Sequence, residues 1–236
     1  MTDHRTDRIH AAVQSLPFFR GLSADERRQI ECLATLRDLQ RGETLWNAGD
    51  PATTLTLIVR GRIKIVRHGG GGDVILEIFG ETEPVGAVAV YNRMPYPASA
   101  VALEPCTLLC VPARDYFELL ERHPDLARSL MAELTRLYMS LSRKLEGMRG
   151  QRVEARIAQL FLALAERMGR TSDEGVVIAM PLSRQEVAEM VNTTVETSIR
   201  VLSRWGREGV MLTGERRFVI PSCEALRAIA EGKADG

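Results

Sequence analysis

The spacing of hydrophobic residues changes at Pro112, and this change constrains the fold more than any other feature of the chain. Between residues 35 and 111, apolar and polar residues alternate with a period of two, which is typical of half-buried β-strands. After Pro112 the apolar residues recur every three or four positions, which predicts helices. The sequence therefore predicts an α+β protein with a sheet domain first and helices after it.

The first region contains five segments rich in β-branched and aliphatic residues, separated by turns that carry Gly or Pro. These predicted strands lie at 55–61, 62–68, 73–79, 98–104 and 106–111. Regularly spaced short strands predict a barrel or sandwich, and the run Gly69–Gly72 is expected to form a hairpin turn. Short helices are expected between residues 9 and 33, where Ser23 and Glu26 have the spacing of a capping box.

A short helix at 113–123 is followed by Pro124, which suits the first position of a second, longer helix. That helix carries an apolar stripe, and we expect it to pack against its own copy in a parallel pair. The predicted dimer interface is Leu130, Leu134, Leu137, Leu141 and Leu145. The alternative is that the helix lies only on its own domain. Glycines near residue 150 mark a boundary, so the predicted segments are a strand-rich domain at 1–112, connecting and dimerisation helices at 113–149, and a C-terminal domain at 150–236.

Two helix starts lie close together between residues 182 and 210. A capping box from Ser183 to Glu186 opens a helix to about Met190, and a second from Thr193 to Glu196 opens a helix to about Glu208. The link between the helices is so short that they must cross steeply. The segment therefore predicts a helix-turn-helix.

The second of these helices has two distinct faces. The spacing turns one set of residues inward, namely Ser198, Val201, Leu202 and Trp205, and another set outward, namely Glu196, Arg200, Ser203 and Arg207. An arginine fork can donate two bonds to guanine, and a carboxylate can accept one from cytosine, so the outward face suits major-groove readout. The alternative is a surface salt bridge between Glu196 and Arg200.

Two short strands predicted around Gly214 place Arg216 and Arg217 near a hairpin tip, where a winged arrangement contacts phosphate. The predicted DNA-binding residues are Arg184, Thr193, Thr194, Val195, Glu196, Ile199, Arg200, Ser203, Arg216 and Arg217. The chain has 31 basic and 31 acidic residues, so its net charge does not favour nucleic acid and the hypothesis depends on residue placement.

Other classes of protein are less consistent with the sequence. No apolar run is long enough to span a bilayer, and the polar N-terminus lacks the apolar region of a signal peptide, so we expect a cytoplasmic protein without a membrane partner. The four cysteines lack CxxC spacing, which predicts reduced residues that fill the core and no zinc site. No nucleophile–base grouping, HExxH motif or P-loop is present, so we do not expect an enzyme.

With these motifs the chain resembles the Crp/Fnr family of regulators, named after the cyclic-AMP receptor protein and the fumarate and nitrate reduction regulator. The resemblance runs from residues 16–23, through the glycines of the sheet region, to the helix-turn-helix at 182–205. It implies a β-roll like that of cyclic-nucleotide-binding domains, a homodimer and a C-terminal winged helix-turn-helix. It further implies that Glu196 and Arg200 contact base edges in two inverted half-sites about 34 Å apart, and that RNA polymerase is a partner.

The resemblance also marks a candidate effector pocket. Its residues are Gly86, Ala87, Val88, Arg93, Tyr96, Pro97, Ala98 and Ser99. Members that bind cyclic AMP carry Glu after the glycine and an Arg-Ser pair further on, whereas this chain has Ala87 and Tyr96-Pro97 at those positions. A buried phosphodiester without its cation costs several kcal/mol. We therefore expect a small-molecule or gas effector other than cyclic AMP, with Arg93 available for an anionic one.

Two further alternatives follow from the resemblance. An iron–sulfur cluster needs four cysteine ligands, and the N-terminal region offers only Cys32, so no such cluster is expected. Haem stays open as a cofactor, with His68 as the first candidate axial ligand among His4, His10, His68 and His123. The second hypothesis for function is a regulatory module that controls a protein partner, as cyclic-nucleotide domains do in kinases and channels. That hypothesis predicts no specific DNA binding.

Overall fold

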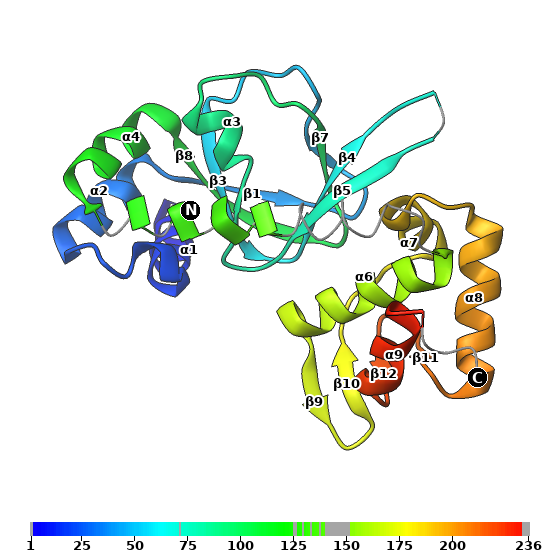
Figure 1. Ribbon diagram of the computed structural model, residues 1–236. Helices are drawn as coiled ribbons and strands as arrows, with labels where there is room; N and C mark the ends of the chain where they lie inside the picture. Colours follow the sequence, from blue (N-terminus) through cyan, green and yellow to red (C-terminus); the bar gives the residue numbers. More distant parts are fainter. Residues whose placement is uncertain are drawn as a thin grey trace. The chain divides into compact units, whose positions relative to one another are not determined.

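The computed structural model describes residues 2–70, 72–124, 127–128, 130–132, 134–136, 138–139 and 152–232. The chain divides into two compact units, one built from residues 1–70 and 76–139 and the other from residues 71–75 and 140–236. Figure 1 shows the strands of the first unit and the helices that accompany them, followed along the chain by the predominantly helical second unit. Each unit is described by itself.

Two four-stranded antiparallel sheets form the β-roll of the first unit. One sheet has the order β1-β8-β3-β6 and the other β2-β7-β4-β5. The strands are β1 (Thr35–Leu39), β2 (Thr44–Trp46), β3 (Thr54–Arg60), β4 (Ile63–Arg67), β5 (Val74–Phe79), β6 (Pro84–Val85), β7 (Ser99–Ala102) and β8 (Cys106–Pro112). The five strands predicted from alternation are confirmed as β3, β4, β5, β7 and β8. The predictions missed β2 and β6, because two or three residues are too few to show a period. They also missed β1, whose two leucines lie three positions apart and do not alternate with polar residues.

The strands β3 and β8 separate two hydrophobic cores. Leu109 and Leu57 pack toward the N-terminal helices, whereas Leu108 and Ile58 pack inside the roll. Neighbouring residues of a strand point to opposite faces, so both faces of this sheet are covered. Fully buried leucine or isoleucine side chains contribute about 1.5–3 kcal/mol each, and these two cores hold the roll together.

Helices cover the outer face of the sheet that contains β8. They are α1 (Thr2–Ser15), the 3-10 turn η1 (Pro17–Phe19), α2 (Ala24–Leu33) and α4 (Ala113–Arg122), and a short helix, α3 (Ala87–Tyr91), follows β6. The capping box at α2 is confirmed, since the Ser23 amide donates to Glu26 Oε2 at 2.7 Å and the Glu26 amide donates to Ser23 Oγ at 3.4 Å. Helix α1 begins at Thr2, seven positions before the predicted start at residue 9. The prediction missed these first turns because they are polar and carry no apolar stripe.

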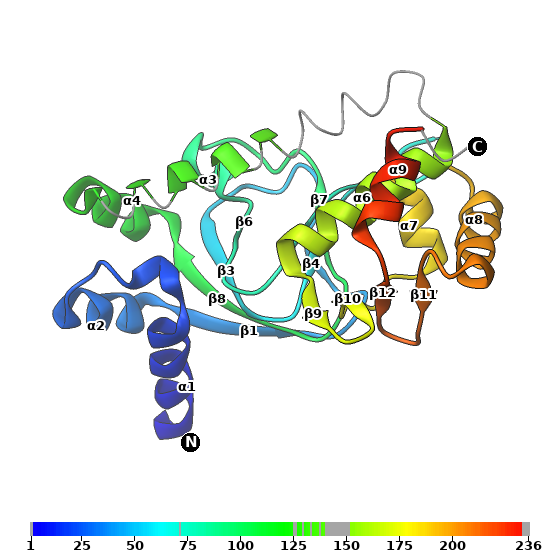
Figure 2. The same ribbon diagram turned by 60° about the horizontal axis from the view of Figure 1, so that its bottom comes forward.

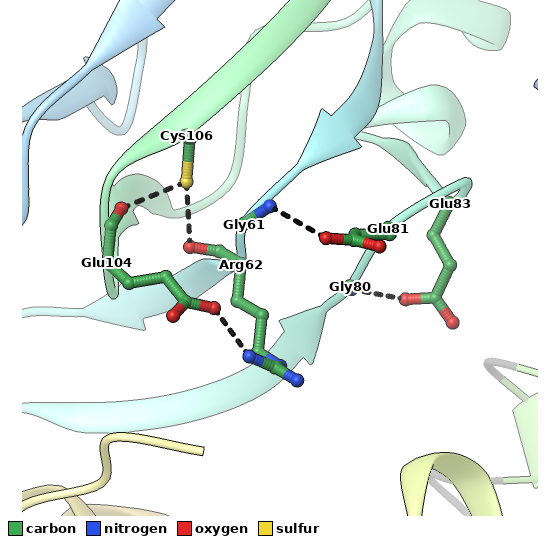
Figure 3. Close-up of polar contacts among 7 residues, drawn as sticks. All are labelled: Gly61, Arg62, Gly80, Glu81, Glu83, Glu104 and Cys106. Carbon is green, nitrogen blue, oxygen red and sulfur yellow. Dashed lines mark hydrogen bonds and ion pairs between the residues drawn. The ribbon is translucent and has the colours of Figure 1, made fainter. Parts of the chain in front are cut away.

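Figure 3 shows the polar contacts that fix the turn between β3 and β4. Gly61 has a φ of 90°, and an added Cβ would lie 2.5 Å from the carbonyl oxygen of Pro105, so only glycine fits. Next to it, Arg62 and Glu104 form a largely buried ion pair. The Cys106 thiol donates to the carbonyl oxygens of Arg62 and Glu104 at 3.2 and 3.1 Å. These contacts lock the corner where the chain passes from one sheet to the other.

All four cysteines are free. The prediction that they fill the core is confirmed for Cys106, which is buried, whereas Cys110 and Cys223 are half-buried. It is wrong for Cys32, which is exposed because it lies on the outer side of α2. Burial raises the pKa of the Cys106 and Cys110 thiols, which keeps both protonated and poorly reactive.

The second unit combines a helix-turn-helix with a small sheet, as Figure 2 shows. Its elements are α6 (Val153–Met168), β9 (Arg170–Ser172), β10 (Gly175–Ile178), α7 (Arg184–Val191), α8 (Val195–Glu208), β11 (Leu212–Thr213), β12 (Phe218–Ile220) and α9 (Cys223–Ala230). The strands form an antiparallel sheet of order β11-β12-β10-β9. In the described part of the chain no helix is both long enough and apolar enough to cross a membrane.

Candidate nucleic-acid interface

The first helix of the motif, α7, begins at the predicted capping box. The Ser183 amide donates to Glu186 Oε2 at 2.8 Å, and the Glu186 amide donates to Ser183 Oγ at 3.1 Å. Glu186 is buried, so its carboxylate satisfies a backbone donor that would otherwise lack a partner at the helix start. This reciprocal cap fixes where α7 begins.

The turn between the helices differs from the prediction by one residue. Asn192 adopts a left-handed conformation with a φ of 52°, and the Thr193 amide still bonds to the carbonyl oxygen of Ala188 at 3.0 Å. Thr193 therefore belongs to the turn, and the predicted capping box from Thr193 is wrong. Thr194 caps α8 instead, because its Oγ1 accepts from the Thr197 amide at 3.3 Å.

Arg156 of α6 stabilises this turn through two hydrogen bonds. Its Nε donates to the carbonyl oxygen of Val191 at 3.0 Å, and its Nη2 donates to that of Asn192 at 3.3 Å. These carbonyls end α7 and have no acceptor role within the helix. Sequence reasoning missed Arg156 because it lies 35 positions before Val191 and the local pattern carries no sign of the contact.

The two faces of α8 are as the spacing predicts. Ser198, Val201, Leu202 and Trp205 are each at most 2% exposed. Glu196, Arg200, Ser203 and Arg207 are exposed, and Ile199 beside them is 45% exposed. The buried stripe anchors the helix to its own unit, so the opposite stripe is held toward solvent in a fixed orientation.

Glu196 and Arg200 do not form a salt bridge with each other. Among the residues that the structure describes, neither side chain makes a hydrogen bond or an ion pair. Arg204 provides the contrast, because it pairs with Glu154 of α6 and with Glu208 at 3.7 Å. The carboxylate and guanidinium on the outward stripe are therefore available to an external partner, whereas Arg204 holds α8 against α6.

Arg184 contacts the wing. Its Nη2 donates to Thr213 Oγ1 at 2.9 Å, and its guanidinium lies 5.9 Å from the ring centroid of Phe218. Partial burial lowers the pKa of Arg184, although the group stays charged at neutral pH. Arg217 is exposed near the wing tip and pairs weakly with Glu174 at 3.7 Å, and Arg216 is also exposed. The predicted cations thus lie on the recognition helix, on the start of α7 and on the wing.

The predicted dimer helix is described only in part. Leu130 is buried in the core of its own unit and Leu134 packs against that core, which leaves little of either side chain for a partner. Leu137, Leu141 and Leu145 lie outside the described residues. Among the described residues of this segment, the large apolar side chains that are exposed are Met131, Tyr138 and Met139.

The predicted effector pocket is mostly filled by the protein itself. Gly86 has a φ of 72°, and an added Cβ would lie 2.7 Å from Tyr96 and 2.9 Å from Trp46. Trp46 stacks on Tyr96 with 3.9 Å between centroids, so the rings occupy the space beside the glycine. Ala87, Ala98 and Ser99 are also buried, whereas Val88 and Pro97 are exposed.

Arg93 does not face these rings. It is exposed, with its guanidinium 5.6 Å from the ring centroid of Phe117. His68 is exposed in the loop after β4, and no histidine lines the cavity described in this unit. His10 and His123 are paired with Glu31 and Glu26 at 2.9 and 2.8 Å. The described histidines therefore do not form an apolar haem pocket.

Comparison with known proteins agrees with both units. Residues 36–123 match the family model of the cyclic nucleotide-binding domain, and residues 155–229 match that of the Crp-like helix-turn-helix domain. The cyclic AMP receptor protein of Thermus thermophilus is 28% identical over 219 residues, which cover 92% of this chain and 98% of the relative. The transcriptional activator protein anr of Pseudomonas aeruginosa is 26% identical over 201 residues, covering 85% and 82%.

The solved structure of FixK2 from Bradyrhizobium japonicum has the same fold, with a TM-score of 0.72 at 18% identity over 83% of this chain and 96% of that one. A β-roll followed by a winged helix-turn-helix with an exposed recognition helix defines a DNA-binding transcription regulator. The chain belongs to the Crp/Fnr family of these regulators.

Proposed function

We propose that this regulator acts as a homodimer on an inverted-repeat DNA site, reads bases through Glu196 and Arg200, and responds to an effector other than cyclic AMP. The family resemblance adds RNA polymerase as a partner at the promoter. The observation that carries the proposal is the outward stripe of α8, where a carboxylate and a guanidinium four residues apart have no partner among the described residues. Their donor and acceptor patterns match guanine and cytosine edges.

Selection of bound duplexes from a random pool tests the proposal. The expected product is a pair of inverted half-sites with centres about 34 Å apart, because a two-fold dimer places its recognition helices in successive major grooves. Enrichment of a single unrepeated site, or no enrichment over the starting pool, would contradict it. A mobility shift with selected and scrambled duplexes gives the ratio of specific to non-specific affinity.

The exposed apolar side chains after α4 support the homodimer. Met131 and Tyr138 are 64% and 67% exposed and lie seven residues apart, which places them on the same side of a helix at heptad spacing. The prediction from sequence placed the dimer contact on Leu130, Leu134, Leu137, Leu141 and Leu145, and the first of these is buried in its own unit. We therefore place the partner helix against the stripe that contains Met131 and Tyr138.

The double substitution Met131→Glu and Tyr138→Glu is expected to convert the dimer to monomer, because four charges would then meet at an apolar helix pair. Sedimentation analysis measures the mass directly. Arg128→Glu, at an exposed position of the same segment, is the control for a change of charge outside the Met131–Tyr138 stripe. A double variant that stays dimeric, with unchanged thermal stability, would place the dimer contact elsewhere.

The packing around Gly86 supports an effector other than cyclic AMP. The stacked rings of Trp46 and Tyr96 lie against the glycine, and Arg93 lies over Phe117. A cyclic phosphate at this place would meet aromatic carbon and no cation from the predicted pocket residues. Leaving an anion uncompensated is costly enough to prevent binding at cellular concentrations.

Titration calorimetry with cyclic AMP is expected to give no saturable heat at ligand concentrations up to about 1 mM, which corresponds to a binding free energy weaker than about −4 kcal/mol. Tyr96→Arg is the informative variant because it restores a cation near Gly86. Micromolar affinity of the unaltered protein for cyclic AMP would refute this part of the proposal.

A further inference from the structure

A cavity of about 420 Å³ lies in the first unit, between strands β1, β2, β3 and β8. Of the residues predicted for the effector pocket, only Tyr96 lines this cavity. Small-molecule sites in proteins range from about 300 to 1,000 Å³, so this volume is large enough for a small metabolite. The cavity is therefore a separate candidate site within the roll.

One wall of the cavity is aromatic and rigid. Trp46 and Tyr96 are parallel within 8°, and each is tied to a backbone oxygen. Trp46 Nε1 donates to the carbonyl of Ala98 at 3.1 Å, and the Tyr96 hydroxyl donates to that of Thr54 at 3.3 Å. Apolar residues also line the cavity, namely Leu33, Leu45, Pro51 and Pro112. The wall suits an apolar group of the ligand.

A cation lines the cavity at Arg37 of β1. Its guanidinium donates to the carbonyl oxygens of Leu45 and Thr44 at 3.0 and 3.2 Å, which uses two of its five N–H donors. Within the described residues no carboxylate pairs with it. The two backbone bonds hold the guanidinium in place, and its remaining donors suit the planar fork of a carboxylate.

A carboxylate lines the same cavity at Asp50. Its Oδ2 accepts from the Asn47 amide at 2.9 Å, and in the described part of the chain it has no cationic partner. Burial, together with the nearby Cys110 and Asp50, raises the pKa of the Tyr96 phenol to about 12. The Tyr96 amide also donates to the carbonyl oxygen of Asp50 at 2.9 Å, so Asp50 lies beside the aromatic wall. A cavity with one unpaired charge of each sign suits a ligand that carries both.

We propose that this cavity binds an apolar α-amino acid as its zwitterion, with the carboxylate on Arg37, the ammonium group on Asp50 and the side chain against the Trp46–Tyr96 wall. Thr35, Thr53 and Thr56 also line the cavity, and in this proposal their hydroxyls contact the polar end of the ligand. The assignment concerns ligand binding and stands independently of how the protein reads DNA.

Tryptophan fluorescence of the full-length chain tests the proposal, because Trp46 lines the cavity and reports on its occupancy. The probes are leucine, isoleucine, methionine and phenylalanine, each titrated separately, with titration calorimetry as a second readout. We expect at least one to bind saturably. For leucine the matched analogues are 4-methylpentanoate, which lacks the amino group, and 3-methylbutylamine, which lacks the carboxylate. Each analogue is expected to bind about tenfold or more weakly, because one charge-assisted bond is lost.

Arg37→Gln and Asp50→Asn are each expected to weaken binding of the same amino acid about tenfold or more. Arg37→Lys keeps the positive charge but loses the paired bonds to the carbonyl oxygens of Leu45 and Thr44. It tests whether loss of those bonds alone disturbs the Trp46–Tyr96 wall. Arg60→Gln, at an exposed position outside the cavity, is the matched control and should bind normally. No saturable binding of any probe up to about 10 mM, equal affinity for the matched analogues, or normal binding by folded Arg37→Gln would each overturn the proposal.

Discussion

Replacing Arg200 by alanine is expected to abolish the base preference of this regulator at one position of each half-site while leaving its fold unchanged. A bidentate arginine–guanine contact contributes about 1–3 kcal/mol of discrimination, and a dimer loses two of them, or about 2–6 kcal/mol. The side chain is exposed on α8 and makes no contact within the described residues, so its removal leaves no cavity and no unpaired buried group. Binding-site selection with the variant measures the lost preference directly.

Arg207→Ala is the matched control for this experiment, because Arg207 is exposed on the same helix but lies at its last turn, away from the N-terminal residues that enter a groove. It should weaken binding to all duplexes to a similar, small extent and leave the selected sequence unchanged. If the selected sequence is the same for Arg200→Ala as for the unaltered chain, Arg200 does not read a base.

The recognition helix could be predicted from sequence because its information is local. Ser198, Val201, Leu202 and Trp205 repeat at helical spacing, so one face had to be buried and Arg200 had to lie on the other. Whether that arginine pairs with a neighbour on its own helix depends on rotamers and on the next element. For that reason the structure is needed to distinguish the two arginines. Arg200 is unpaired within the described residues, whereas Arg204 forms an ion pair with Glu154 of α6.

The parts that sequence did not predict depend on contacts between distant elements. Arg156 and Arg184 lie on separate helices, and the partners that define their roles are Val191 at the end of α7 and Thr213 in the wing. Leu130 is another example, because it is buried in the core of its own unit although the sequence predicted it at a dimer interface. A leucine stripe has the same spacing whether it packs on its own domain or on a second copy of the chain. Periodicity identifies an apolar face, but only tertiary packing identifies what covers it.

The packing inside the predicted effector region could not be predicted from the sequence either. The sequence placed Tyr96 where cyclic-AMP-binding relatives carry a phosphate ligand, but nothing nearby in the chain indicates that Trp46, fifty positions earlier, stacks on it. The stack closes the space beside Gly86 and at the same time forms a wall of the cavity that Arg37 and Asp50 line. A change of ligand class can thus follow from aromatic packing between β2 and the segment before β7.

Trp205→Ala is expected to lower the free energy of unfolding of the second unit by about 3–5 kcal/mol, the usual cost of removing a large aromatic side chain from a core. Trp205 is 1% exposed and anchors the buried stripe of α8. Small domains are stable by only about 5–15 kcal/mol, so specific DNA binding should fall sharply and the thermal midpoint of this unit should drop by more than about 10 °C. Circular dichroism at a helical wavelength follows the transition.

The same variant allows the unfolding of the two units to be followed separately. The chain contains only two tryptophans, so the one left in this variant is Trp46, which belongs to the roll. Its fluorescence should remain native-like at temperatures where the helical signal of Trp205→Ala is already lost. Leu212→Ala, at a residue that is 45% exposed in the wing, is the control and should change stability by less than about 0.5 kcal/mol. Loss of the Trp46 signal together with the helical signal would show that the roll cannot stay folded without the helix-turn-helix unit, and that the two unfold as one cooperative structure.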